Sequence, residues 1–205
     1  MQTTVETTSL GTKLERVGTL LRTVGWVGFW LDLGLAAAAG LMLIFAIAGR
    51  SFNQAVVTPV PGAPVNPALP ATTPGMGIGI FWAVCTILAL LVSVYLAYRQ
   101  TRFAKRLQNP DPIVHPPKHD IVQLLRLGAI VGFVGMLFAV FGGVTTLSIL
   151  LAKSLSQVQS VAVYDPSRMI RSLDIFVALA NMTGIAAHLV GTFTSASLFE
   201  WIHRQ

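Results

Sequence analysis

The apolar stretch at residues 174–199 constrains the fold of this chain more than any other segment. It is long enough to cross a bilayer, which takes about 20 apolar residues in a helix. Polar residues recur along it at intervals of seven: Asp174, Asn181, His188 and Ser195. Seven residues nearly complete two helical turns, so these groups share one stripe, and Gly184 and Gly191 share another. Polar groups in lipid need partners inside the protein, so this helix must pack against other helices.

The composition places the chain among membrane proteins. Of its 205 residues, 54% are hydrophobic and 11% charged, and the mean hydropathy is +0.70. The net charge of +6 comes from basic residues that lie between apolar runs, a distribution that argues against nucleic-acid binding. The single cysteine, Cys85, excludes an internal disulfide.

Four apolar runs predict an all-α, polytopic membrane protein whose four transmembrane helices form a bundle. The predicted spans are residues 24–49, 76–98, 127–152 and 174–199. We expect one membrane domain over residues 13–205, in which residues 13–22 form either an interfacial amphipathic helix or a basic lead-in. Six prolines in the segment 51–75 predict an extended loop, since proline lacks a backbone N–H and fixes φ.

The first twelve residues are polar and contain an acidic residue, unlike a basic signal peptide or an acid-poor transit peptide. We therefore expect residues 1–12 to be a disordered tail, and the first membrane helix to act as its own uncleaved signal.

The basic residues predict the orientation. Ten of the fourteen Lys and Arg residues fall in the N-terminal segment, the central loop and the C-terminus, and four fall on the other side. Because cytoplasmic loops are enriched in Lys and Arg, both termini are expected in the cytoplasm.

The chain also contains an internal similarity. Residues 20–29 and 124–133 are identical at six of ten positions, about half the chain apart. The similarity either reflects two parallel helical-hairpin repeats or follows from shared membrane composition.

Three polar residues are the candidate site. Asp32 lies roughly 12 Å into the first span and His188 roughly 16 Å into the fourth from the same side, so the two are expected at comparable depth. Asn181 lies one layer further out. An acid in lipid must be paired, protonated or hydrated. The group therefore forms either a proton- or metal-linked path or a polar clamp that fixes helix register, and the identity of any metal stays open.

Small residues predict where helices approach closely. Gly128 and Gly132 form a small-xxx-small pair in the third span, and Gly184 and Gly191 line the fourth. By contrast, His115 and His119 flank two prolines, so helical metal-ligand spacing is not expected there. We find no nucleophile–base pair and no cofactor motif, so we predict neither an enzyme nor a bound cofactor.

Several short motifs carry a resemblance to a known family. They are Leu14-Glu15-Arg16-Val17, Gly28-Phe29-Trp30, Pro116-Pro117, Asp120-Ile121-Val122, Leu125-Arg126, and Leu173-Asp174-Ile175-Phe176 leading to Asn181 and His188. The chain resembles the small four-helix subunit of the chloroplast inner-envelope translocon, also called the permease in chloroplasts, and its cyanobacterial relatives. The proline-rich segment 58–74 departs from the family pattern.

The resemblance implies an integral protein of a plastid inner envelope or a cyanobacterial membrane. The family is associated with both iron transport and protein import. With no transit peptide expected, a cyanobacterial plasma or thylakoid membrane is the predicted location.

Two functions from different classes follow. The chain is expected to aid transport of a metal ion, with iron as the candidate, in a homo-oligomer. Alternatively, it is a scaffold, assembly or protein-translocation subunit that binds other membrane proteins.

Overall fold

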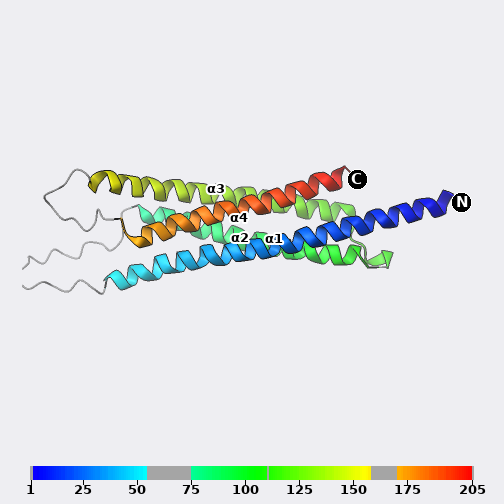
Figure 1. The fold of residues 1–205 in the computed structure, drawn as a ribbon, viewed down its shortest axis with the longest axis horizontal. Helices are drawn as coiled ribbons and strands as arrows, with labels where there is room; N and C mark the ends of the chain where they lie inside the picture. The colour runs from blue at the N-terminus through cyan, green and yellow to red at the C-terminus, as the bar shows by residue number, and fades with distance from the viewer. Residues whose placement is uncertain (1, 55–74, 110, 158–169, 205) are drawn as a thin grey trace, which may run out of the picture. The chain divides into compact units, whose positions relative to one another are not determined.

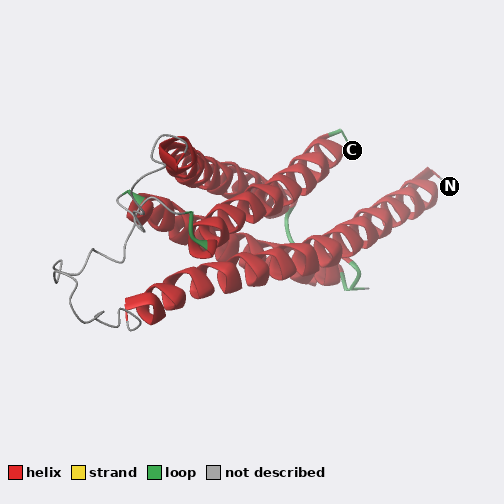
Figure 2. Ribbon diagram, turned by 60° about the vertical axis from the view of Figure 1, so that its left-hand side comes forward, coloured by secondary structure: helices red, strands yellow, loops and turns green. Residues whose placement is uncertain are grey.

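The computed structural model describes residues 2–54, 75–109, 111–157 and 170–204. Within these ranges the chain folds into four α-helices without strands (Figures 1 and 2). They are α1 (Gln2–Gln54), α2 (Met76–Leu107), α3 (Lys118–Gln157) and α4 (Ser172–His203), with a short 3-10 helix at Pro112–Val114. Each α-helix contains a segment long and apolar enough to cross a membrane. The prediction of a four-helix, multi-pass membrane protein is confirmed.

The helices extend well beyond the predicted spans. Helix α1 is continuous from Gln2 to Gln54, through the predicted tail at residues 1–12, the segment 13–22 and the start of the predicted loop. The first proline of the chain is Pro59, so nothing in this range lacks the backbone N–H that a helix uses. The rest of the proline-rich segment, residues 55–74, lies outside the described residues.

Local sequence explains where the central helices begin and end. Helix α2 starts after Gly75, whose φ of 86° lies in the left-handed region that favours glycine. Helix α3 starts directly after Pro116-Pro117. Between these helices His115 lies in the loop, with Nε2 2.9 Å from the backbone oxygen of Asn109, as expected for a loop rather than a helical metal site.

The chain divides into two compact units, and each takes a segment from all four helices. Unit 1 comprises Met1–Leu35, Ala89–Val134 and Ala186–Gln205, and unit 2 comprises Ala36–Leu88 and Gly135–Ile185. Unit 1 has a core of buried aliphatic side chains: Leu21, Ala104, Leu107, Ile121, Leu125, Leu198 and Ile202. Unit 2 has a small core at Ala46, Met76 and Val177.

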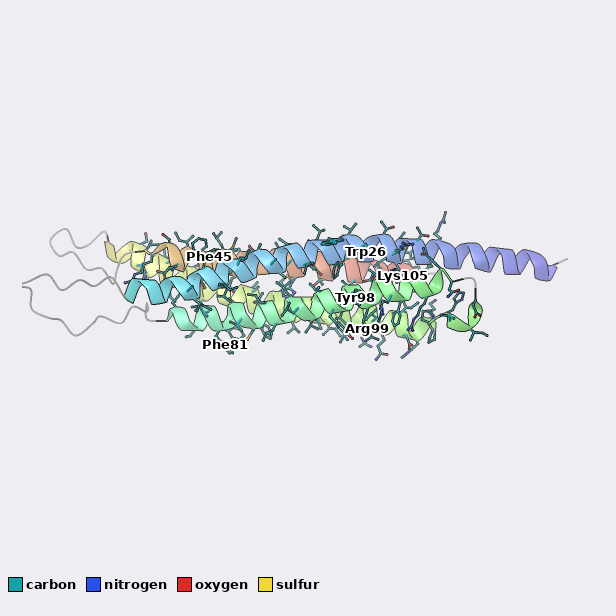
Figure 3. The ribbon with its side chains drawn as sticks, turned by 90° about the horizontal axis from the view of Figure 1, so that it is seen from below. Trp26, Phe45, Phe81, Tyr98, Arg99 and Lys105 are labelled. Carbon is teal, nitrogen blue, oxygen red and sulfur yellow. The ribbon has the colours of Figure 1, made fainter. Side chains whose placement is uncertain are left out.

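The helices expose large apolar and aromatic side chains, as expected of a protein surrounded by lipid. Trp26 and Tyr98 of unit 1 and Phe45 and Phe81 of unit 2 are all exposed and are labelled in Figure 3. In unit 1 the guanidinium of Arg102 lies 5.5 Å from the Tyr98 ring centroid. Aromatic rings beside basic groups are typical of the membrane–water interface, so this part of unit 1 suits the headgroup region.

Candidate polar site

Asp32 of α1 is 3% exposed, although it lies in an apolar span. Its carboxylate faces Gly191 of α4, and a Cβ at Gly191 would lie 3.3 Å from Oδ2 and 3.6 Å from Oδ1. That spacing is tight for a side-chain carbon, so the glycine leaves room for the carboxylate to lie against the α4 backbone. The structure thus brings Asp32 to the small-residue stripe of the fourth helix.

A cavity of about 20 Å³ lies beside Asp32 within unit 1. This is enough for roughly one water molecule. Thirteen residues line it: Val24, Gly25, Gly28, Asp32, Ser93, Leu96, Ala97, Gln100, Leu124, Gly128, Gly191, Thr194 and Ser195. Oδ1 of Asp32 is buried and has no hydrogen-bond partner among the residues that the structure describes. The carboxylate therefore has unused acceptor capacity at a polar cavity.

Four further polar side chains line the same cavity. Ser93 and Gln100 come from α2, and Thr194 and Ser195 come from α4. The Thr194 hydroxyl donates within its own helix, 3.0 Å to the Val190 carbonyl and 2.9 Å to that of Gly191. Its proton is thus engaged, and its oxygen keeps acceptor capacity.

Sequence reasoning did not identify the α2 contribution to this site. Ser93 and Gln100 lie seven residues apart, and Thr86 and Gly79 continue the same series towards the start of α2. This is the spacing that marks the polar stripe of α4, so the same rule applied to the second span would have found them.

His188 of α4 is 1% exposed and belongs to the same unit as Asp32. It lies one turn before Gly191, the residue that the carboxylate faces. Its backbone oxygen is 3.4 Å from the position that a Cβ of Gly132 would take. Both predicted ionisable residues are therefore buried in unit 1. Direct pairing of the Asp32 carboxylate with the His188 imidazole stays a prediction.

Asn181, the third predicted residue, belongs to unit 2 rather than unit 1. It is fully buried, and its Nδ2 donates to the Val177 carbonyl at 3.0 Å. Its Oδ1 has no hydrogen-bond partner in the described part of the chain. The amide packs against Gly142 of α3, where a Cβ would overlap Oδ1. Within its unit Asn181 fills the space left by a glycine.

The four glycines predicted for helix packing have close neighbours on other helices. A Cβ at Gly128 would lie 2.9 Å from Ser195 Oγ, and one at Gly132 would overlap Thr192 Oγ1. In unit 2, a Cβ at Gly184 would lie 2.5 Å from Thr86 Cγ2. Gly191 faces Asp32, as described above.

Asp174 corrects one expectation. From the sequence, Asp174 is expected to be a helix N-cap or to form a surface ion pair near Arg171. The structure buries Asp174, with its Oδ2 2.6 Å from Nζ of Lys153, which is also buried. The prediction that Asp174 lies at the surface was wrong, because α3 continues past the predicted end of its span and carries Lys153 towards α4. Asp174 is not the N-cap, because α4 begins at Ser172, but its Oδ2 accepts a hydrogen bond from the Arg171 backbone N–H at 3.4 Å, as the third helical residue of a capping box does.

No cluster of three or more His, Cys, Asp or Glu side chains that could hold a metal ion occurs among the described residues. The polar side chains that line the cavity of unit 1 are instead one carboxylate, three hydroxyls and one amide.

The chain is similar to known proteins over most of its length. The family described as "Protein of unknown function (DUF3611)" matches residues 11–203. A curated relative from Arabidopsis thaliana, named "Protein TIC 21, chloroplastic", is 30% identical over 197 residues. That match covers 92% of this chain, but the chain spans only 58% of the relative. No solved structure matches the chain.

Proposed function

The chain belongs to the family described as "Protein of unknown function (DUF3611)", and from this premise we propose that it helps a metal cation, with iron as the candidate, to cross a membrane. The observation that carries the proposal is the burial of Asp32 and His188 within one unit of a four-span protein. Ionisable residues inside membrane segments are costly and typically mark ion pathways.

The membrane proposed for this activity is a cyanobacterial plasma or thylakoid membrane, or a plastid inner membrane. The named relative is chloroplastic, which supports a membrane of this type. The cavity beside Asp32, at about 20 Å³, holds roughly one water and is too small for a hydrated metal ion. We therefore propose that the cation passes between the protomers of a homo-oligomer, and that the buried Asp32 and His188 gate this pathway from inside each protomer rather than line it.

The test is iron uptake by liposomes that contain the purified protein, followed with an entrapped iron-sensitive dye. Asp32→Asn and His188→Ala are each expected to lower uptake to the level of protein-free liposomes. Glu200→Gln is the matched control, because the Glu200 carboxylate is 64% exposed and pairs with Arg204 at the surface. Wild-type uptake by both site variants would contradict the proposal.

The second candidate is a scaffold or protein-translocation subunit. It is favoured by glycines that no other part of the described chain approaches: Gly34 and Gly77 are exposed, with nothing within 4 Å of a Cβ position. Such positions let a helix of another protein come close. Purification in mild detergent separates the two candidates. Stoichiometric partner proteins together with no uptake by the isolated chain would favour the scaffold.

A further inference from the structure

We infer that the cavity beside Asp32 is a binding site for one alkali-metal cation, Na⁺ or K⁺. The inference concerns binding by unit 1 and goes beyond the proposed transport of a metal cargo.

The first argument is the set of atoms that the cavity wall offers. Besides the Asp32 carboxylate, its polar side chains are two hydroxyls, Ser93 and Ser195, the amide of Gln100 and the hydroxyl of Thr194. All of these groups contain oxygen, and the wall contains no thiol and no imidazole. Oxygen ligands of this kind suit hard cations rather than soft transition metals.

The second argument is charge. Among the thirteen lining residues Asp32 is the one ionisable side chain, so the site carries a single negative charge when the carboxylate is ionised. One monovalent cation neutralises it. A divalent ion would leave a net positive charge buried between helices, which is unfavourable in surroundings of low polarity. The site is therefore matched to a charge of one.

The third argument is the size of the cavity. The cavity admits roughly one water-sized particle, so a bound cation must lose most of its hydration shell. Protein oxygens then have to replace the water, as they do in other membrane ion sites. Oδ1 of Asp32, buried and with no hydrogen-bond partner in the described ranges, is available for this role.

A substitution at Gly28 changes the space in the cavity without changing the charge of its lining. Gly28 lines the cavity and is buried, yet nothing lies within 4 Å of the position a Cβ would take. Gly28→Ala therefore places a methyl group in open space at the cavity wall. The substitution also favours the helix, since alanine has the higher helix propensity, so loss of folding is not expected.

The experiment measures equilibrium binding of radioactive sodium, and of rubidium in place of potassium, to the purified full-length protein in lipid nanodiscs. We expect saturable binding of one ion per protomer. Both Asp32→Asn and Gly28→Ala should weaken it by about tenfold or more, because a charge-assisted contact is lost or blocked. Gly34→Ala and Glu200→Gln, at exposed positions away from the cavity, should bind like the wild type.

A second measurement, thermal unfolding, tests cation binding without radioactive ions. The melting temperature of the wild type should rise when Na⁺ or K⁺ replaces choline at constant ionic strength, since a ligand stabilises the state that binds it. Asp32→Asn should lack this rise. Stabilisation by acidification alone, without a response to either cation, would assign the cavity to a proton and overturn the inference.

The absence of saturable binding in the wild type would also overturn it, as would unchanged binding in both cavity variants. A protein that binds the alkali cation but carries no iron would leave this inference intact and remove the proposed transport function.

Discussion

The side chain of Asn181 occupies space that is open because Gly142 has no side chain. The asparagine is fully buried, its Nδ2 is bonded to the Val177 carbonyl, and its Oδ1 occupies the place where a Cβ of Gly142 would lie. Adding a carbon at Gly142 would push the amide off its hydrogen bond. A membrane core of this kind depends on close backbone approach, because lipid provides little hydrophobic drive for helices to associate.

Gly142→Ala is therefore expected to destabilise the protein by about 1–3 kcal/mol through overpacking. Gly143→Ala is the matched control on the same helix, since its Cβ would lie 3.9 Å from Asn181 Cβ, an ordinary contact. Its effect should stay within about 1 kcal/mol, the scale of helix propensity. Thermal unfolding in detergent measures both. Equal stability of the two variants would contradict the packing argument.

The candidate site could be predicted from the sequence only in part. Asp32 and His188 were identifiable because an ionisable residue in an apolar run is rare, and both prove to be buried. Ser93 and Gln100 were missed because a serine or glutamine carries no comparable signal by itself, although the seven-residue spacing applied to the fourth span also links these two residues. Knowing which oxygens face one cavity requires the rotation of each helix about its axis, and hydropathy does not specify that rotation.

At the scale of the helices, hydropathy identified every span but not its ends. It marks the segment that lipid must cover, and helices continue outside lipid until a residue stops them. Helix α2 runs on to Leu107, past the predicted end of its span at residue 98. Its last turn carries Lys105 and Arg106, which interact favourably with the carboxyl end of the helix dipole.

The Lys153–Asp174 pair joins α3 to α4 and predicts a specific stability pattern. Lys153→Met alone should cost about 3–5 kcal/mol, because it leaves a buried carboxylate without its ammonium. The double variant Lys153→Met with Asp174→Leu should recover most of this loss, since it removes both charges together. A double-mutant cycle of unfolding free energies measures the coupling. Additive losses would show that the two charges do not stabilise each other.

At the scale of the whole molecule, four spans predict that both ends of the chain lie on one side of the membrane. The distribution of Lys and Arg predicts that this side is the cytoplasm. Reporters that are active only in the cytoplasm, fused at either end, should both be active, whereas one inserted after Pro67 should be silent. Opposite results for the two ends would require an odd number of spans.

The number of helices followed from the sequence, but the division into two compact units did not. Each unit is assembled from pieces of all four helices that lie far apart in sequence, such as Met1–Leu35 and Ala186–Gln205. Single-sequence periodicity describes one helix at a time and says nothing of which segments gather together. The expectation of one membrane domain over residues 13–205 stays a prediction.

The buried ion pair also bears on how the chain is made at the ribosome. Helix α3 emerges before α4, so for a time the Lys153 ammonium has no Asp174 to neutralise it. An unpaired ammonium resists entry into hydrocarbon and tends to stay at the water boundary. We therefore expect the far end of α3 to reach its final position only after α4 has been synthesised, so that the two helices enter the membrane together.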